Sequence, residues 1–308
     1  MIKTSRQLKE KIKNLTHGDS LKSQTLLRTY MMERFLERLA VSQYNSHFVL
    51  KGGMLVSSMV GIHQRATMDI DATVVALPLT LEDATRTIQE IVNIDLQDGV
   101  VFSITNAESI MEEHDYPGLR FTLIGTLDGL RQKVKIDIST GDAITPREVR
   151  YRFHLMFEER AIEILAYSLE TVLAEKLETV ISRATTNTRM RDFYDLHILC
   201  QLYGGTLTAR VLADALCATA RRRGTLRLLS EAEDVLRELA DDPHMRKLWD
   251  TYRARYSYAS ELTWDIVLSS VRQLCIAAGL AVELPEVTLT APSRTAASAV
   301  LRRREKER

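Results

Sequence analysis

The sequence lacks any apolar run that approaches the roughly 20 residues needed to span a membrane as a helix. Its N-terminal segment, MIKTSRQLKEKIKNL, is charged throughout and has no apolar core of the kind that a secretory signal requires. Cysteine is scarce, with three residues far apart and no CxxC pair, namely Cys200, Cys217 and Cys275. All three lie in helical patterns, so we interpret them as small core residues in a reducing compartment. These absences predict a cytoplasmic protein without a membrane partner.

Net charge is also missing, because 41 Lys and Arg residues balance 41 Asp and Glu residues. A neutral chain has no overall basic field to attract nucleic acid, so any such contact must come from local patches. Internal repeats and low-complexity domains are absent as well. The composition, with 45% hydrophobic and 27% charged residues over 308 positions, is ordinary for a globular protein of one large or two smaller domains.

The most informative stretch is residues 48–75, FVLKGGMLVSSMVGIHQRATMDIDATVV. Apolar runs separated by glycines and followed by alternating residues predict a strand, a turn, a short helix and a second strand. These features fall at 48–50, Gly52-Gly53, 54–62 and 68–76, and the second strand carries Asp69 and Asp71.

Asp69 and Asp71 lie two positions apart in this second strand. Because side chains alternate between the faces of a strand, both carboxylates are expected on one face, with Ile70 directed into the core. Two like charges on one face repel each other unless a cation lies between them. A hard ion such as Mg²⁺, with Mn²⁺ as the alternative, would relieve this repulsion and bind substrate phosphates. A solvent-facing strand edge is the competing interpretation.

Gly52 and Gly53 favour the metal site over the strand edge. Glycines let backbone N–H groups come close to an anion, and here they stand at the start of a helix, whose N-terminus favours negative charge. A phosphate cradle followed by paired carboxylates is what nucleotidyl transfer requires. The stretch therefore predicts an NTP site in which Asp69 and Asp71 hold the metal.

The same residues resemble a known family. Lys51-Gly52-Gly53 followed by RATMDID at 65–71 is similar to the GG…R.T.DID signature of the AbiEii/AbiGii toxins, with a slightly longer spacer. The resemblance implies a nucleotidyltransferase fold and the toxin role of a type IV toxin–antitoxin or phage-abortive system. It implies an RNA acceptor, with the tRNA 3′ end expected first, and a cognate antitoxin encoded nearby. The nucleotide contacts expected in this stretch are Lys51, Gly52, Gly53, Arg65 and Thr67.

Asp137 is a third candidate metal ligand. The strand expected at 132–139 alternates strictly, which places Lys133, Lys135, Asp137 and Ser139 on one face. An isolated aspartate on a wet strand face is usually only solvated. Asp137, however, has the place in the strand order at which nucleotidyltransferases carry a third carboxylate. We therefore expect it to complete the metal site or to orient the attacking hydroxyl.

The second half of the chain predicts helices. Ser168 is expected to cap a helix that runs to about Arg183, with Lys176 in the middle of its apolar stripe and Arg183 beside it. A lysine on an apolar face is costly to bury without a partner, although its long side chain can also carry the ammonium group out to water. We expect both cations to face a cleft and bind the triphosphate of the nucleotide.

The next helix, expected at 191–202, carries Asp192 and Asp195 on its packing face. Asp192 could cap this helix, and an ion pair of Asp195 with Lys176 or Arg183 is the structural alternative. The segment AEKLETVISRATTNTRMRDFYDL also resembles the second conserved block of the AbiEii/AbiGii family. By that resemblance Lys176 is a catalytic or nucleotide-contacting lysine, and either Asp192 or Asp195 is an essential acid. Their spacing leaves the choice between the two open.

The densest basic cluster is Arg221-Arg222-Arg223, with Arg210 and Arg227 nearby. Such a run is usually a solvated helix end, and its functional interpretation is a landing site for RNA phosphates.

The expected architecture is α+β, with a nucleotidyltransferase-type mixed sheet and flanking helices followed by a C-terminal helical domain. The domain ranges are 1–160 for the catalytic domain, 161–290 for the helical domain and 291–308 for a basic, flexible tail. The other helices are expected at 3–15, 21–42, 81–94, 208–222, 230–240, 244–256 and 263–279. The other strands are expected at 100–104 and 118–125, with a hairpin turn at Asp128-Gly129, and 149–157 is expected to be either an edge strand or an arm between domains.

Two classes of function follow from these features. The first is a metal-dependent nucleotidyltransferase, in which carboxylates align an acceptor hydroxyl for in-line attack on the α-phosphorus of an NTP. The second is a non-catalytic module that binds an NTP or a protein partner on the same scaffold. The complete set of three acids and a lysine argues against the second class. An enzyme that nucleotidylates a small molecule such as an antibiotic would differ only in its acceptor.

Overall fold

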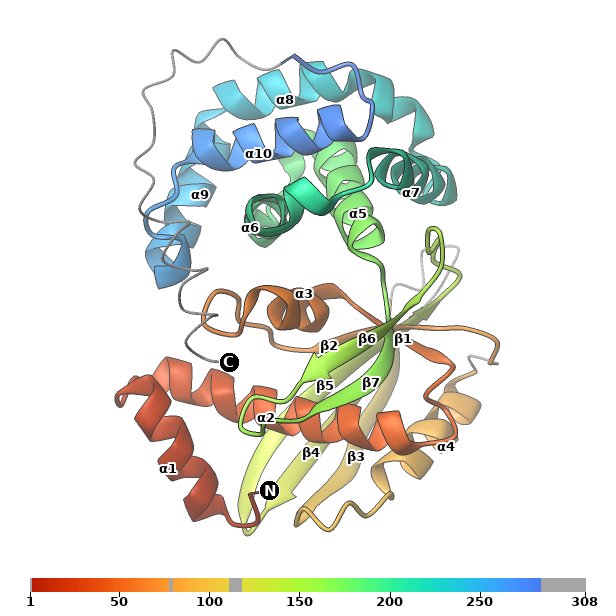
Figure 1. Ribbon diagram of the computed structural model, residues 1–308, viewed down its shortest axis with the longest axis vertical. Helices are drawn as coiled ribbons and strands as arrows, with labels where there is room; N and C mark the ends of the chain where they lie inside the picture. Colours follow the sequence, from red (N-terminus) through yellow and green to blue (C-terminus); the bar gives the residue numbers. More distant parts are fainter. Residues whose placement is uncertain (1, 78–79, 111–117, 284–308) are drawn as a thin grey trace.

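The chain folds into a half built on one mixed sheet and a half built from helices (Figure 1). This computed structural model describes residues 2–77, 80–110 and 118–283, so the tail predicted at 291–308 lies outside the described residues. The α+β class and the C-terminal run of helices are as predicted. None of the described helices is long and apolar enough to cross a membrane.

The sheet has seven strands in the order β3-β4-β5-β2-β1-β7-β6. Their bounds are β1 (Phe48–Lys51), β2 (Ile70–Val74), β3 (Val100–Ile110), β4 (Gly118–Leu127), β5 (Leu130–Thr140), β6 (Val149–His154) and β7 (Ala161–Ala166). β2 is antiparallel to β1 and parallel to β5, and β1 is parallel to β7. The predicted hairpin joins β4 to β5, and both Asp128 and Gly129 take the positive φ that such two-residue turns require.

The last strand extends the sheet beyond residue 160, where the sequence predicts the end of the first domain. β7 pairs with β1 through Leu165 and Ala166, and the helical half begins only at Leu169. The predicted edge strand is present as β6, which pairs with β7 alone. Residues 161–166 therefore belong to the sheet because they pair in parallel with β1, which is far away in the sequence.

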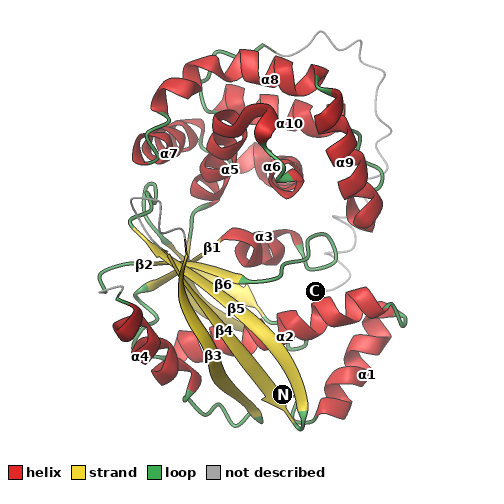
Figure 2. Cartoon of the chain, turned by 180° about the vertical axis from the view of Figure 1, so that it is seen from behind, coloured by secondary structure: helices red, strands yellow, loops and turns green. Residues whose placement is uncertain are grey.

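One face of the sheet is covered by α2 (Ser20–Val41), with α1 (Ser5–Thr16) and α4 (Leu81–Val92) beside it (Figure 1). Buried Phe35 and Leu36 of α2 share a small apolar cavity with Ile70 of β2 and Ile136 of β5. Because strand side chains alternate, Asp71 and Asp137 must face away from α2. Figure 2, turned by 180° from Figure 1, shows the sheet from the side opposite α2.

The helical half contains α5 (Leu169–Arg183), α6 (Met190–Tyr203), α7 (Ala209–Arg222), α8 (Ala232–Asp241), α9 (Pro243–Arg255) and α10 (Trp264–Ala277). The Ser168 hydroxyl accepts the Thr171 N–H and caps α5, as predicted. Between the sheet and α6 lies α3 (Gly52–Val60), which begins at the glycine turn (Figure 1). The core interpretation of the cysteines holds for Cys275 but is wrong for Cys217, which is exposed on α7.

A fully buried ion pair fixes α2 to the start of β3. Arg38 donates to both carboxylate oxygens of Asp98 at 2.9 Å each, and the two side chains are 1% and 0% exposed. The Arg38 guanidinium also donates to the carbonyl of Val100 at 2.6 Å. Two buried charges are tolerable only when each satisfies the other, so the pair should be intolerant of single substitutions.

We expect Asp98→Ala to lower the free energy of unfolding by about 3–5 kcal/mol, because Arg38 would remain buried without a counter-charge. Urea unfolding followed by circular dichroism measures this loss. The matched control is Glu82→Ala, which removes an exposed ion pair with Arg86 and should leave the midpoint unchanged. Equal midpoints for the two variants would show that the buried pair is not needed.

Candidate active site

A row of four charged residues crosses the sheet on the face turned away from α2. Lys51 of β1 lies opposite Asp71 of β2, Asp71 lies beside Asp137 of β5, and Asp137 lies opposite Arg120 of β4. Neighbouring side chains at such positions are about 5 Å apart at their Cβ atoms. The row therefore places two carboxylates side by side, with one cation at each end.

The glycine turn makes room for the first of these acids. Gly52 has φ of +62°, and a Cβ atom built on it would lie 2.2 Å from the Oδ2 atom of Asp71. The N–H of Gly53 donates to that same oxygen at 3.3 Å. A side chain at position 52 would thus displace the carboxylate, so the glycine serves Asp71 directly as well as opening the start of α3.

Asp69 and Asp71 are acids without a cationic partner. Among the described residues, neither carboxylate forms an ion pair, although both line the same cleft. Burial, reinforced by the charges of Asp69 and Asp137, raises the pKa of Asp71 to about 6. The charge of Lys51 lowers this pKa but does not outweigh burial and repulsion, so the site concentrates negative charge beyond what its neighbouring cations in the described chain offset.

Arg120, which sequence reasoning missed, holds the third acid. Its Nε and Nη2 atoms donate to the two oxygens of Asp137 at 2.8 and 2.6 Å. Two parallel charge-assisted hydrogen bonds of this kind fix the orientation of a carboxylate. Asp137 is therefore on the expected face and next to Asp71, but its carboxylate is engaged by Arg120.

Lys51, at the other end of the row, is held by Asp142. Its ammonium group donates to Ser139 at 2.7 Å and forms an ion pair with Asp142. Burial raises the pKa of Asp142, but the Lys51 charge and hydrogen bonds from Lys51, Thr73 and Ser139 outweigh burial and lower it to about 2. Lys51 lines the cleft as predicted for a nucleotide contact, with its charge already paired.

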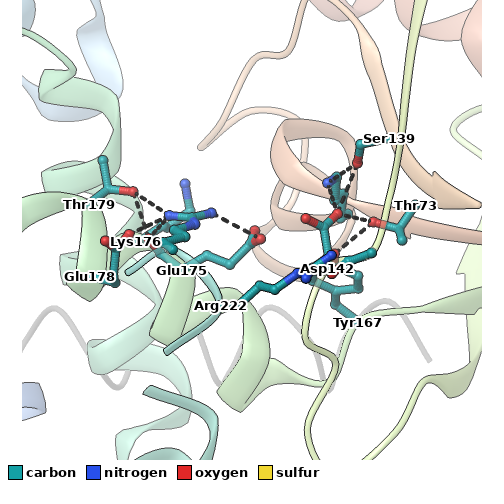
Figure 3. Close-up of polar contacts among 12 residues, drawn as sticks. Thr73, Ser139, Asp142, Tyr167, Glu175, Lys176, Glu178, Thr179 and Arg222 are labelled. Carbon is teal, nitrogen blue, oxygen red and sulfur yellow. Dashed lines mark hydrogen bonds and ion pairs between the residues drawn. The ribbon is translucent and has the colours of Figure 1, made fainter. Parts of the chain in front are cut away.

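The cleft between the two halves has a volume of about 1270 Å³. We name its two sides the sheet wall and the helical wall. The sheet wall includes Lys51, Gly52, Gly53, Asp69, Asp71, Asp137 and Asp142. The helical wall includes Lys176, Arg183, Arg189, Arg191, Asp192, Arg221, Arg222, Arg223, Tyr252, Arg255 and Tyr256. In Figure 3 the side chain of Arg222 on the helical wall extends toward Asp142 on the sheet wall.

A buried ionic network joins the walls behind the cleft. Lys176 of α5 donates to Asp192 at 2.7 Å and pairs with Asp195 at 2.8 Å, both on α6. Arg65, from the loop before β2, donates to the two oxygens of Asp195 at 2.9 and 3.0 Å. Burial raises the pKa of Asp195, but the charges of Arg65 and Lys176 outweigh it and lower that pKa to about 2. Asp195 is therefore ionised despite its burial.

The network separates the two candidate acids of α6. Asp195 is 0% exposed and does not line the cleft, whereas Asp192 does. Arg65 also lines the cleft, but its guanidinium is directed to Asp195. Thr67, the remaining predicted nucleotide contact, is buried beside Gly53 and donates to the carbonyl of Asp69 at 3.3 Å. Asp195 thus holds Lys176 from the buried side, and Asp192, itself only 2% exposed, is the acid on the cleft side of the network.

The arginines of the predicted basic cluster differ in their contacts. Arg223 forms ion pairs with Glu175 and Glu178 of α5, and Arg222 donates to the carbonyl of Gly141. Arg221 lines the cleft, while Arg210 and Arg227 do not. Within the described part of the chain, four arginines of the helical wall have no carboxylate partner. They are Arg183, Arg191, Arg221 and Arg255.

The raised pKa of Asp71 predicts a pH-dependent stability. Its pKa is about 6 in the folded protein against an ordinary value of 3.8, so folding takes up a proton between these values. The stabilising contribution is full below about pH 4 and is lost as the pH rises through about 6. Asp71→Asn is therefore expected to raise Tm by a few degrees at about pH 8 without divalent cations, and to change little at about pH 4. Thermal melts at both pH values, with exposed Asp214→Asn as control, test this; equal shifts at both would contradict it.

The network predicts different costs for two conservative substitutions on α6. Asp195→Asn leaves Arg65 and Lys176 buried without a counter-charge and should cost about 3–5 kcal/mol. Asp192→Asn should cost much less, because Lys176 keeps Asp195 and the other partner, Arg189, is 56% exposed. Urea unfolding of both variants makes the comparison. If Asp192→Asn lowered the free energy of unfolding as much as Asp195→Asn, the proposed difference between the two aspartates would be wrong.

Solved structures similar to this chain include two proteins from Helicobacter pylori and one from a fungus. A candidate nucleotidyltransferase from H. pylori is 17% identical with a TM-score of 0.45, covering 83% of this chain and 93% of its own. JHP933 from H. pylori is 19% identical with a TM-score of 0.46, covering 83% and 90%. An antigenic nucleotidyltransferase-like protein from Paracoccidioides brasiliensis is 14% identical with a TM-score of 0.34, covering 66% and 90%. A search of curated proteins finds no match.

Comparison with protein families gives the assignment. Residues 34–270 match the family described as the nucleotidyl transferase AbiEii toxin of type IV toxin–antitoxin systems. The matched range contains the charged row of the sheet wall, the buried network and the arginines of the helical wall. The resemblance seen in two short motifs is thereby confirmed over most of the chain. This chain belongs to the AbiEii family and is a nucleotidyltransferase toxin of a type IV toxin–antitoxin system, a system that supplies a cognate antitoxin as its partner.

Proposed function

We propose that this nucleotidyltransferase moves a nucleoside monophosphate from an NTP to an RNA acceptor, the tRNA 3′ end, in the cytoplasm with Mg²⁺ as cofactor. The observation that carries the proposal is the charge distribution of one cleft. Judged on the described residues, its sheet wall presents two carboxylates without an ion pair, Asp69 and Asp71, and its helical wall presents four arginines without a carboxylate partner. A metal-bound triphosphate and an RNA backbone supply the missing charges of both walls.

The acids of the sheet wall fit a hard divalent ion. Mg²⁺, or Mn²⁺ in its place, is commonly bound by one or two carboxylates together with water and substrate phosphates, and Asp69 and Asp71 offer that set. No group of three such ligands is arranged to hold a metal among the residues that the structure describes, and Asp137 is engaged by Arg120. Asp69 and Asp71 would therefore hold the ion. When bound, it would neutralise charge on the phosphates and align the acceptor hydroxyl.

The remaining residues of the cleft act on the nucleotide and the acceptor. The N–H of Gly53 is taken by Asp71, so the other N–H groups at the start of α3 receive phosphate, where the helix N-terminus favours an anion. Lys176, held by two aspartates, and Arg183, without a carboxylate partner among the described residues, bind the triphosphate. The acceptor hydroxyl forms a new bond to the α-phosphorus, and the bond to the β-phosphate breaks to release pyrophosphate. Asp137, oriented by Arg120, is placed to receive the hydroxyl proton.

The size of the cleft favours a large acceptor. Its volume of about 1270 Å³ exceeds the roughly 300–1,000 Å³ of typical small-molecule sites. An NTP would leave room for the end of a polymer, which a small antibiotic acceptor would not need. The unpaired arginines of the helical wall also suit a phosphate backbone. The tRNA 3′ end follows from the family resemblance and is tested directly below.

We expect Asp71→Asn to reduce transfer at least about 1000-fold, because the acids of the sheet wall would lose one of their two metal-holding carboxylates. Each α-labelled NTP in turn is incubated with total tRNA and Mg²⁺, and the label on RNA is measured. Asp214→Asn, an exposed change on α7 outside the cleft, should transfer normally.

A second readout does not depend on turnover. Mg²⁺ should raise Tm of the unsubstituted protein at about pH 8 and leave that of Asp71→Asn unchanged. Normal transfer by Asp71→Asn would overturn the role given to the sheet wall. Label on a small molecule but never on RNA would favour the antibiotic type of acceptor. NTP binding without transfer to any acceptor would favour the non-catalytic module.

A further inference from the structure

Tyr256 stands in the helical wall in an unusual setting for a surface tyrosine. It follows the end of α9, is half-buried and lines the cleft. Its ring stacks on Tyr258, with 5.3 Å between the ring centroids and 20° between the planes, and lies 4.8 Å from Tyr252. These neighbours hold the ring in one orientation at the edge of the cleft.

Two arginines from different helices flank this ring. Arg191, at the start of α6, donates from Nη2 to the Tyr256 hydroxyl at 3.4 Å. Arg255, the exposed last residue of α9, has its guanidinium carbon over the face of the ring, 5.6 Å from the ring centroid. Both line the cleft, and neither pairs with a carboxylate within the described ranges. Their charges are therefore available to an anion from the cleft.

A neighbouring arginine shows that this arrangement is specific. Arg253 lies on the same helix, two residues from Arg255, but its side chain pairs with Asp250 at 2.9 Å. Arg253 does not line the cleft. Of these two arginines, only Arg255 lines the cleft and lacks a carboxylate partner in the described chain.

We infer that Tyr256, Arg191 and Arg255 form a subsite for single-stranded RNA, in which a nucleobase stacks on the face of Tyr256 that the exposed Arg255 side chain covers in the free protein. Arg255 then turns to one flanking phosphate, and Arg191 contacts the other. Aromatic rings with adjacent arginines are the usual platform for unpaired bases, because every base has a face that can stack. The identity of the RNA as the acceptor rests on the proposed function.

The placement of the two arginines favours a strand over a free nucleotide. A nucleoside within a strand has a phosphate on its 5′ side and another on its 3′ side, whereas an NTP carries all its phosphates on the 5′ side. Two cations from two helices contact the single ring of Tyr256 at different places, Arg191 at its hydroxyl and Arg255 over its face. The triphosphate of an NTP, by contrast, is matched by the sheet wall and by Lys176. The base of the NTP is the alternative occupant, and the test separates the two.

The test measures binding rather than chemistry. The full-length protein is titrated with a short single-stranded RNA of tRNA 3′-end sequence in the absence of NTP, and separately with an NTP analogue that cannot be cleaved between its α- and β-phosphates. Tyr256→Ala should weaken RNA binding roughly 5- to 150-fold, the range expected for loss of one stacked base. Tyr256→Phe, which keeps the ring, should bind RNA within about threefold of the unsubstituted protein. Binding of the NTP analogue should not change in either variant.

The arginines have a separate signature in the salt dependence of RNA binding. Arg255→Ala should reduce the slope of log affinity against log salt by about 0.7, the value for one phosphate contact on a single strand. Arg253→Ala is the matched control and should leave the slope unchanged. If Arg255→Ala and Arg253→Ala gave the same slope, Arg255 would not contact a phosphate of the RNA.

Three outcomes overturn the inference: no RNA binding by the unsubstituted protein, unchanged RNA binding by Tyr256→Ala, or a loss of NTP-analogue binding as large as the loss of RNA binding. Because Tyr256 packs on other rings, Tyr256→Leu serves as a second variant that keeps apolar bulk, and thermal melts establish that each variant folds. RNA binding in the absence of NTP needs no turnover. If RNA binds through Tyr256 but is never labelled, the proposed transfer is overturned and the inference of the subsite stands. Transfer to RNA that does not change in the Tyr256 variants would overturn only the inference of the subsite.

Discussion

A carboxylate with no exposed surface, Asp195, ties the two halves of this protein together. It binds Arg65 from the loop before β2 and shares Lys176 of α5 with Asp192. Buried ions are tolerated only when each is paired, so these side chains have few alternative positions. Asp195 thus holds both the loop that leads into Asp69 and Lys176 of the helical wall. The geometry between the sheet wall and the helical wall depends on this interaction.

A second constraint acts on the sheet wall, and it lowers the stability of the fold. Asp71 and Asp137 lie side by side, and burial with mutual repulsion raises the pKa of Asp71 to about 6. The fold tolerates this arrangement because Lys51 and Arg120 stand at the two ends of the row and because Gly52 leaves space for the Asp71 carboxylate. Charge that the protein leaves unneutralised at such a position is a common feature of functional sites.

Local patterns predicted the elements well, and pairings distant in the sequence account for what they missed. Strand alternation placed Asp137 on one face with Lys133 and Lys135, and its register with Asp71 emerged only when β2 and β5 paired. Arg120 was missed because its place opposite Asp137 depends on strand register, which the residues around Arg120 do not encode. Helical spacing put Asp192 and Asp195 on one face but could not rank their depth. That ranking depends on Arg65, about 130 positions away.

Neutral composition conceals how strongly the charges of this chain are segregated. Forty-one basic and 41 acidic residues cancel overall, and most buried ions are paired within the fold. Within the described residues, acids without an ion pair on the sheet wall and arginines without one on the helical wall line the same cleft. Neither a simple anion nor a simple cation can satisfy both walls, because each would leave the opposite wall uncompensated. A ligand that brings a metal to the acids and phosphates to the arginines satisfies both, which is why the charge pattern, more than the fold, supports nucleotide and RNA as the joint occupants of the cleft.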